Sequence, residues 1–455
     1  MVEAFKPEHH DMLRTSVTRR NFLKSSAVFA APLIIPATAL GLSRRAPSER
    51  ITIGVIGLGG RGTQVLKDFL DQPDAQIVAL CDVHPEHHRE LEGGKGPRLG
   101  STPARELVEK SEQSRGNQKA SPFVTSDHRE LLDRPDLDAV VVATPDHWHA
   151  AITLDALRKE KDVYCEKPIT HLFAEGHSVY REVAARKAVF QTGSQQRSDA
   201  LFQQAVELVR NGHLGKIQSI EVGLQQGYDK PMGPTEIKTP PKELNYDRWC
   251  GPSPTLPYMN ARHHRWWRGN RAYGGGVLMD WIGHHNDIAH WGIGQELGGP
   301  TRVEAVGWTM PDFDVYDTPI DYEIACEYAG GIKSLISTKV TGGTKWTGEN
   351  GWVWVNRGKI KCSNPALLDK SFSRGEWKAG PEGEHAANFL TCVRSRAACI
   401  APAEQAHRSI TPGHLGYVSF ALKRPLKWDA KNEVVIDDAE ADRLLKTAKY
   451  RAPWA

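Results

Sequence analysis

The sequence predicts an α/β protein in two parts: an N-terminal doubly wound parallel sheet, followed by an α+β domain with an open, mostly antiparallel sheet. Three observations lead to this prediction. The β-branched run at 51–56 ends in a cluster of glycines. Strand and helix patterns then alternate up to about Ser194. Beyond Leu201 several strand-like segments follow one another instead, as in an antiparallel sheet.

The glycine cluster fits the pattern G-x-G-x-x-G of a Rossmann dinucleotide-binding domain. The first glycine permits a tight turn, the second lets a pyrophosphate approach the backbone, and the third lets the following helix pack closely on the strand. Glycine-rich turns also occur for purely steric reasons, so the surrounding pattern of strands and helices supports the prediction. We expect the whole turn to bind a dinucleotide, through Gly57, Gly59, Gly60, Arg61 and Gly62.

An acidic residue ends the second predicted strand, 76–82. Asp82 lies 25 positions after Gly57, where a carboxylate accepts hydrogen bonds from the adenosine ribose and repels a 2′-phosphate. The cofactor expected is therefore NAD, in preference to NADP. Asp82 is also suited to cap a helix, and the two roles are compatible.

Further strands complete the first sheet. After a polar insertion at 92–119, strands are predicted at 122–125, 137–144, 162–166 and 189–193, with helices at 63–70, 150–159 and 174–186. Ligands bind at the carboxyl ends of the strands in such sheets. The other cofactor-binding candidates stand at those ends: Thr144, Pro145, His149, Glu166, Lys167 and Gln195.

The second part begins with a helix and a strand at 214–223, and a Pro/Gly-rich aromatic stretch follows at 226–276. Strands are predicted at 302–309, as a hairpin over 320–340, and at 352–362, with helices at 277–291, 384–396 and 437–450. We divide the chain into residues 1–46, 47–197 and 198–455, with no long linker between the two domains.

Residues 1–46 are predicted to be a twin-arginine export signal. Thr18–Lys24 closely matches S/T-R-R-x-F-L-K, and a moderately apolar segment and an A-x-A site at 37–39 follow. Two prolines interrupt the apolar segment, which argues against a stable membrane span. The expected partner is the twin-arginine export machinery, and the expected location is the periplasm or another exported compartment.

The composition excludes several classes of protein. Lys and Arg number 58 against 55 Asp and Glu, which gives no basic excess for nucleic acid. Seven dispersed cysteines without a C-x-x-C motif argue against a disulfide framework and a zinc ribbon. Thirteen tryptophans, several of them between Trp249 and Trp291, suit either sugar faces or a large hydrophobic interface.

Two motifs carry the chemistry. Glu166-Lys167-Pro168 follows a buried strand, and residues 274–284 read G-G-G-V-L-M-D-W-I-G-H. With the glycine turn, these motifs resemble the Gfo/Idh/MocA family of nicotinamide-dependent oxidoreductases over roughly residues 50–295. Asp280 and His284 share one helix face. The resemblance implies Lys167, Asp280 and His284 as the catalytic set, although His285 stands beside His284.

No metal site is predicted. The pairs His263-His264, His284-His285 and His147/His149 lack a spacing such as H-E-x-x-H. The Arg262–Arg268 loop is expected to line a sugar or polyol site instead, or to be a structural loop anchored by tryptophans.

The function expected is NAD-dependent oxidation of a CH–OH group in a sugar, polyol or glycoside. An alternative is a glycosidase that uses NAD by transient oxidation and elimination, without net redox change. A second alternative is a non-enzymatic sugar-binding module. By analogy with other open-sheet domains, we also expect a homo-oligomer.

Overall fold

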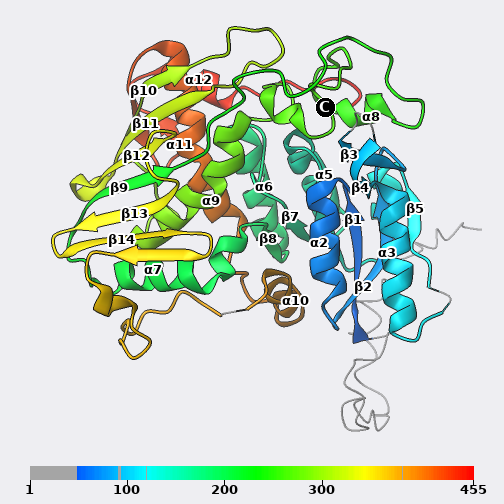
Figure 1. Cartoon of the computed structure of the whole chain (residues 1–455), viewed down its shortest axis with the longest axis horizontal. Helices are drawn as coiled ribbons and strands as arrows, with labels where there is room; N and C mark the ends of the chain where they lie inside the picture. Colours follow the sequence, from blue (N-terminus) through cyan, green and yellow to red (C-terminus); the bar gives the residue numbers. More distant parts are fainter. Residues whose placement is uncertain (1–48, 91–93, 119, 382, 455) are drawn as a thin grey trace, which may run out of the picture.

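The computed structural model describes residues 49–90, 94–118, 120–381 and 383–454. Two sheets with their helices lie beside one another, as Figure 1 shows. The predicted export signal lies outside the described residues. In the part of the chain that is described, no helix combines the length and the apolar character needed to cross a membrane.

The first sheet has six parallel strands in the order β5-β2-β1-β6-β7-β8. They are β1 (Ile51–Ile56), β2 (Ala75–Cys81), β5 (Phe123–Thr125), β6 (Ala139–Val142), β7 (Asp162–Cys165) and β8 (Phe190–Thr192). Because β1 pairs with β2 on one side and β6 on the other, the strand order reverses beside β1. Ligands bind at such a reversal.

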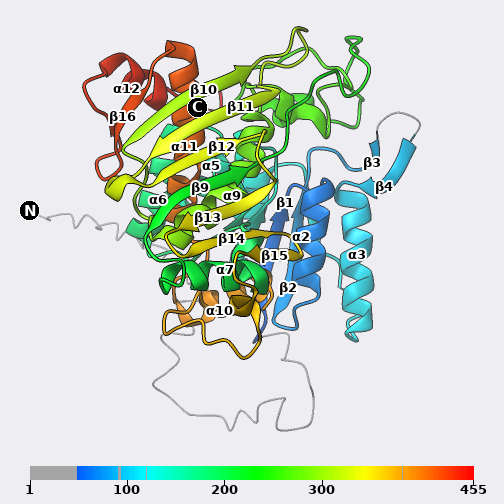
Figure 2. The same cartoon turned by 60° about the vertical axis from the view of Figure 1, so that its left-hand side comes forward.

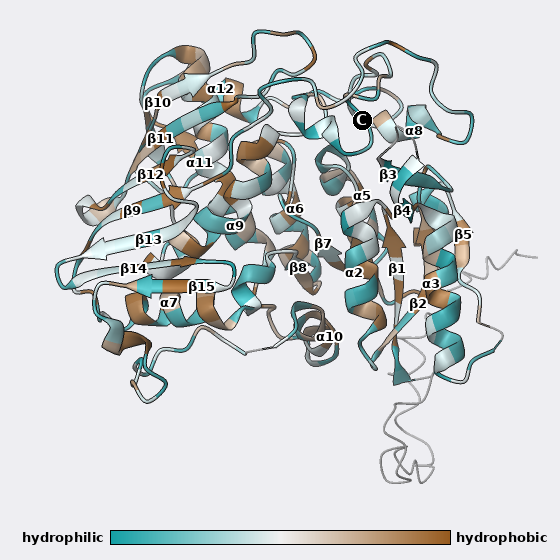
Figure 3. Cartoon of the chain, in the orientation of Figure 1, coloured by the Kyte–Doolittle hydropathy of each residue, from teal (hydrophilic) through white to brown (hydrophobic). Residues whose placement is uncertain are grey.

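Helices cover both faces of this sheet. Buried side chains of α2 (Gly60–Leu70), α3 (Ser101–Ser114) and α10 (His385–Ser395) share one core with residues 51, 53 and 55 of β1. On the opposite face, α4 (His128–Leu132), α5 (Asp146–Arg158) and α6 (Phe173–Arg186) belong to the main core. All six β1 residues are buried, and the strand is coloured as hydrophobic in Figure 3. The predicted doubly wound sheet is confirmed.

The polar insertion at 92–119 contains more structure than its composition indicates. A hairpin of β3 (His87–Glu90) and β4 (Lys95–Leu99) precedes α3. Helix α3 buries only a narrow apolar stripe that includes Ala104 and Val108, so its helical periodicity is weak in the sequence.

The second sheet has nine strands in the order β15-β14-β13-β9-β12-β11-β10-β16-β17. They are β9 (Ile217–Gly223), β10 (Arg302–Thr309), β11 (Asp321–Glu327), β12 (Lys333–Ser337), β13 (Gly343–Gly348), β14 (Gly351–Asn356), β15 (Lys359–Cys362), β16 (Leu426–Asp429) and β17 (Val434–Val435). Only β9 and β12 pair in parallel among these strands. The open, mostly antiparallel sheet is confirmed, although 352–362 forms a hairpin rather than one strand.

Three helices cover one face of this sheet: α7 (Ala200–Arg210), α9 (Gly276–Ile293) and α11 (Ala403–Leu422). Figure 2 shows the sheet in front of them. Alternate side chains such as Ile220, Val222 and Ile324 are buried in the core on the helical side. The short helices α8 (Tyr246–Cys250) and α12 (Ala439–Lys446) and the 3-10 turns η5 (Gln195–Ser198), η6 (Trp266–Gly269), η7 (Ala329–Gly331) and η8 (Pro365–Leu368) complete the chain.

A buried ion pair connects the two domains. Arg197 donates from Nε and Nη2 to the two carboxylate oxygens of Asp287 on α9, at 2.7 and 2.8 Å. Both side chains are 2% exposed. The boundary predicted at residue 197 is therefore a packed junction rather than a free linker.

Candidate active site

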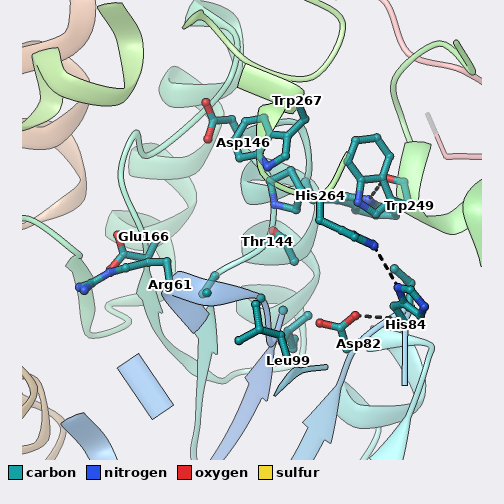
Figure 4. A pocket seen from close by; sticks show the side chains of 18 of the residues that line it. Arg61, Asp82, His84, Leu99, Thr144, Asp146, Glu166, Trp249, His264 and Trp267 are labelled. Carbon is teal, nitrogen blue, oxygen red and sulfur yellow. Dashed lines mark hydrogen bonds and ion pairs between the residues drawn. The ribbon is translucent and has the colours of Figure 1, made fainter. Parts of the chain in front are cut away.

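A cavity of about 540 Å³ opens at the carboxyl ends of the first sheet and is closed from the other side by the loop that carries η6. Figure 4 shows its lining. Most of the predicted cofactor-binding residues line it: Gly57, Gly59, Gly60, Arg61, Asp82, Thr144, Pro145, His149, Glu166 and Lys167.

The glycine turn has the form that a dinucleotide requires. Gly57 has φ +89°, and a Cβ there would stand 2.7 Å from the backbone of Ala143. A Cβ on Gly62 would collide with the Gly57 carbonyl oxygen, so this glycine permits close packing of helix on strand. Gly59 and Gly60 face open space at the start of α2, where backbone N–H groups bind phosphates. The turn therefore fits the pyrophosphate of a dinucleotide.

Asp82 lies at the end of β2 and at the other end of the cavity. Its carboxylate accepts from the backbone N–H groups of Leu58, at 2.6 Å, and His84, at 2.9 Å. Burial raises the pKa of Asp82, and these backbone donors partly offset that rise. Since each carboxylate oxygen can accept a second hydrogen bond, the group fits the predicted contact with a ribose.

Glu166 organises the part of the cavity beyond β7. Its Oε1 accepts from Arg61 Nε, at 2.9 Å, and from Gln195 Nε2, at 3.0 Å. A Cβ on Gly193 would lie 2.5 Å from the same oxygen, so this glycine leaves the carboxylate its place. The structure thus brings together three of the predicted cofactor-binding side chains.

His149 supports the walls of the cavity. Its two ring nitrogens lie 2.7 Å from the Pro168 carbonyl and 3.0 Å from the Thr144 carbonyl, and burial lowers its pKa. The Thr144 hydroxyl is buried without a hydrogen-bond partner among the described residues. That hydroxyl can therefore serve a bound ligand.

Lys167 and Asp280 meet at the edge of the cavity. Lys167 Nζ lies 2.6 Å from Asp280 Oδ1 and donates to its carbonyl oxygen at 3.0 Å. Arg268 Nε lies 3.0 Å from the same carboxylate oxygen. Burial alone would raise the pKa of Asp280, but the charges of Arg268 and Lys167 hold it well below its usual range. Asp280 is thus a fixed anion between two cations.

The neighbouring histidines of α9 have different surroundings. His284 is buried, and burial followed by the charge of Lys167 lowers its pKa well below the ordinary value, so the imidazole is neutral. Its Nδ1 has no partner among the described residues. The ring of His285 instead stacks with Trp281 and lies 3.4 Å from the Thr344 hydroxyl of β13. Of these two histidines, His284 is the one whose pKa the charge of Lys167 lowers.

Two charged residues of the site were not singled out from the sequence. Arg268 stacks on Trp267, 4.3 Å from the ring centroid. Asp146 lines the cavity at the start of α5, and its Oδ2 is buried without a partner in the described part of the chain. Burial raises the pKa of Asp146 to about 8, against the opposing charge of Arg268. Arg268 ends the loop that was expected to line a sugar or polyol site, and Asp146 stands between the predicted cofactor-binding residues Pro145 and His149. Nothing in the sequence marks either side chain by itself.

The histidine pairs considered for metal binding have separate surroundings. His147 lies between the Tyr273 and Trp249 carbonyls, and His263 packs among aromatic rings. His264 instead lies against His84 and His87, a grouping that adjacency in the sequence does not reveal.

Comparison with known proteins places both domains. Residues 51–194 match the model of an oxidoreductase family with an NAD-binding Rossmann fold, and residues 199–455 match the C-terminal alpha/beta domain of the same family.

Among curated relatives, myo-inositol 2-dehydrogenase from Thermotoga maritima is 25% identical over 263 residues, which are 58% of this chain and 60% of the relative. A glycosyl hydrolase family 109 protein from Stenotrophomonas maltophilia is 26% identical over 218 residues, 46% of this chain and 42% of the relative. The chain thus matches less than two thirds of the length of these relatives.

Solved structures share the fold. The WlbA dehydrogenase from Bordetella pertussis, determined with NADH and UDP-GlcNAcA, has a TM-score of 0.58 at 19% identity, covering 84% of this chain and 99% of that one. The aldose-aldose oxidoreductase from Caulobacter crescentus has a TM-score of 0.58 at 17% identity, covering 83% and 99%. With an NAD-binding Rossmann domain and the matching C-terminal domain, the chain belongs to the Gfo/Idh/MocA family of oxidoreductases.

Proposed function

We propose that the protein is an NAD-dependent oxidoreductase that acts on a CH–OH group of a sugar, polyol or glycoside. The observation that carries the proposal is the Lys167–Asp280 contact of 2.6 Å at the edge of the cavity that the glycine turn lines. NAD supplies the acceptor for a hydride from the substrate carbon. The chain's own residues then have to hold the substrate and take the hydroxyl proton.

Each residue has a role that its surroundings support. The Lys167 ammonium, at the end of β7, can donate to the substrate oxygen and stabilise negative charge on it. Neutral His284 can accept the hydroxyl proton as the carbonyl forms. Asp280 positions Lys167 and Arg268 by its charge. With the hydride accepted by bound NAD, His284 would hold the hydroxyl proton and Lys167 would keep its contact with the substrate oxygen, and the product would be the ketone or lactone.

The direct test uses tag-free protein. Nucleotide released on denaturation is identified by mass spectrometry, and the protein is then assayed with NAD and a panel of polyols and aldoses for reduced cofactor. NAD in the protein and reduction by one substrate class support the proposal. A nucleotide-free protein that neither binds NAD nor reduces it favours the sugar-binding module instead.

A second candidate activity is the redox-neutral glycosidase. Relatives named glycosyl hydrolase family 109 proteins, 26% and 29% identical over parts of the chain, favour it. In that reaction the hydride returns to the carbon that lost it. Release of the aglycone from aryl glycosides without accumulation of reduced cofactor distinguishes this activity from net oxidation.

Export and assembly are part of the proposal. Thr18–Lys24 supports transport by the twin-arginine machinery to the periplasm, after folding and cofactor loading. The outer face of the nine-stranded sheet includes Val306, which is 56% exposed. It also includes Trp352 and Trp354 of β14, which alternate with the buried Val353 and Val355. An apolar sheet face of this kind supports a homo-oligomer, and light scattering coupled to size exclusion measures its mass.

A further inference from the structure

Three histidines meet beside Asp82, two of them three residues apart and the third about 180 residues later in the sequence. His84 follows β2, His87 begins β3, and His264 belongs to the loop ahead of η6. One ring nitrogen from each residue lies within 4.8 Å of the others. His84 Nδ1 and His264 Nε2 are 3.1 Å apart, as the dashed line in Figure 4 shows.

The rings of the three histidines pack directly against one another. The His87 and His264 rings stack with centroids 3.9 Å apart, and the His84 ring lies 5.0 Å from His87 and 4.9 Å from His264. Within the described part of the chain, none of the three rings forms a hydrogen bond to a carboxylate. At 3.1 Å, the facing nitrogens of His84 and His264 either share a proton in a hydrogen bond or both donate lone pairs to a cation.

We propose that His84, His87 and His264 bind one divalent transition-metal ion of the zinc class. Imidazole nitrogens suit zinc, cobalt, nickel and copper, whereas calcium and magnesium prefer oxygen. Zn–N distances of about 2.0–2.1 Å place nitrogens on one tetrahedral ion roughly 3.3 Å apart. The His84–His264 separation is already close to this value. The His87 nitrogen lies within 4.8 Å of the other two.

The contacts around the rings fit a metal site. His87 donates from Nδ1 to the His88 carbonyl at 3.0 Å, which leaves Nε2 as the ligand atom. Histidine ligands are commonly oriented in this way by a carbonyl on the other nitrogen. Asp82 accepts the His84 backbone N–H at 2.9 Å, so a carboxylate lies close enough to balance part of the ion's charge.

The three histidines join the first domain to the loop that covers the cavity. His84 and His87 belong to the first domain, whereas His264 belongs to the loop that carries Trp267 and Arg268 over the cavity. An ion on all three residues would hold this loop against the strand end where Asp82 stands. The three rings line the same cavity as the glycine turn, but binding of the ion needs only the chain's own imidazoles and takes no part in the proposed reaction.

The test is a titration of the full-length, tag-free protein with Co²⁺ after dialysis against chelator. One equivalent should produce the visible d–d absorption of tetrahedral cobalt, and Zn²⁺ should displace it. Zn²⁺ should also raise Tm, because an ion that binds only the folded chain stabilises it.

Variants locate the ion. His84→Ala and His264→Asn should each weaken Co²⁺ binding by at least about 100-fold, since even the loss of a residue that only supports a ligand costs 10–100-fold. His88→Ala is the matched control, because this ring bonds the Gly96 carbonyl on the same hairpin and is not in the cluster. It should bind Co²⁺ as the wild type does.

Three results would overturn the proposal: no tetrahedral cobalt spectrum with the wild type, a spectrum that persists in both ligand variants, or equal loss in His88→Ala. Circular dichroism of each variant shows whether it is folded. His264→Asn retains a polar side chain on the loop, so it remains informative if His84→Ala does not fold.

Discussion

Lys167 has two partners on Asp280, and this double contact fixes where its ammonium points. We expect Lys167→Met and His284→Ala each to lower turnover by roughly 10²–10⁴-fold, the usual range for a positioned acid–base group. Because both act on one substrate oxygen, the double variant should lose far less than the product of the two effects. Steady-state kinetics with NAD saturating measure this.

His285→Asn is the control for that prediction. Its ring lies against Trp281 and Thr344, so the substitution should affect stability more than turnover per folded molecule. Severe loss of turnover in folded His285→Asn, with mild loss in His284→Ala, would move the catalytic assignment by one residue.

Asp146 is a buried carboxyl whose pKa is raised to about 8. A pKa above the unfolded value means that the folded protein holds a proton that the unfolded chain releases. The stability from this group is fully present below about pH 4 and is lost as pH rises toward 8.

Asp146→Asn, which mimics the neutral acid, should therefore remove part of the pH dependence of the free energy of unfolding. Between about pH 4 and pH 8, the difference in the free energy of unfolding between wild type and Asp146→Asn should change by on the order of a few kcal/mol. Urea unfolding at a series of pH values measures it. Parallel curves for the two proteins would show that Asp146 does not titrate this way.

Sequence reasoning found the residues with distinctive positions, such as glycines in a fixed pattern or a lysine at a strand end. It placed Arg268 in a loop expected to line the site, but it gave no individual role to Arg268 or Asp146, because their importance comes from burial and from partners distant in the sequence. Arg268 meets Asp280 only through the folding of η6 against α9. Similarly, the spacing His84-x-x-His87 does not by itself indicate a metal site, because the third histidine, His264, lies about 180 residues later.

At the scale of the elements, two glycines of the turn allow effects on folding stability to be measured separately from effects on NAD binding. Gly62→Ala should lower Tm, because its Cβ would collide with the Gly57 carbonyl and push α2 from β1. Gly59 has φ −68°, and a Cβ at this position would have no other atom within 4 Å. Gly59→Ala should therefore leave Tm nearly unchanged and weaken NAD binding, because the methyl group occupies the space for the pyrophosphate.

Calorimetry gives the Tm of Gly62→Ala and Gly59→Ala, and titration with NAD gives their affinities for the cofactor. Equal losses of Tm in the two variants would contradict the packing argument. Full NAD affinity in Gly59→Ala would contradict the position given to the pyrophosphate.

The sequence did not reveal helix α11, and the structure gives a physical reason. Helix α11 contains Pro412, Gly413 and Gly416, which oppose a helix on propensity alone. In the fold these glycines are contact points: a Cβ on Gly416 would meet Ile324 at 2.5 Å, and one on Gly413 would meet Met279 at 2.6 Å. Close packing of the helix overrides propensity there. Long strands with alternating or continuous apolar residues, such as β1 and β10, were predicted well.

At the scale of the whole molecule, Arg197 and Asp287 hold the two domains together. Arg197→Met should cost about 3–5 kcal/mol, because it leaves Asp287 as an unpaired buried charge. The double variant with Asp287→Leu should recover much of this loss. Chemical denaturation gives both values, and an additive double variant would show that the pair is not coupled.

Export can be tested on the intact chain. Arg19→Lys with Arg20→Lys should keep the protein in the cytoplasm with its fold unchanged, because the export machinery recognises the twin arginines. Cell fractionation and Tm measure the two effects. Unimpaired export of the double variant would show that another signal directs the protein.

Strand β9 has a consequence for the order in which the molecule can form. It lies inside the nine-stranded sheet between β12 and β13, and its register joins Ser219 to Lys333 and to Thr347. During synthesis, β9 therefore has no neighbouring strand to pair with until more than a hundred further residues have left the ribosome. Closing so long a loop is slow, and the strand's two unpaired edges are exposed to other chains meanwhile. We expect the second sheet to limit the rate of folding, and the first domain to be completed only when α10 joins its core.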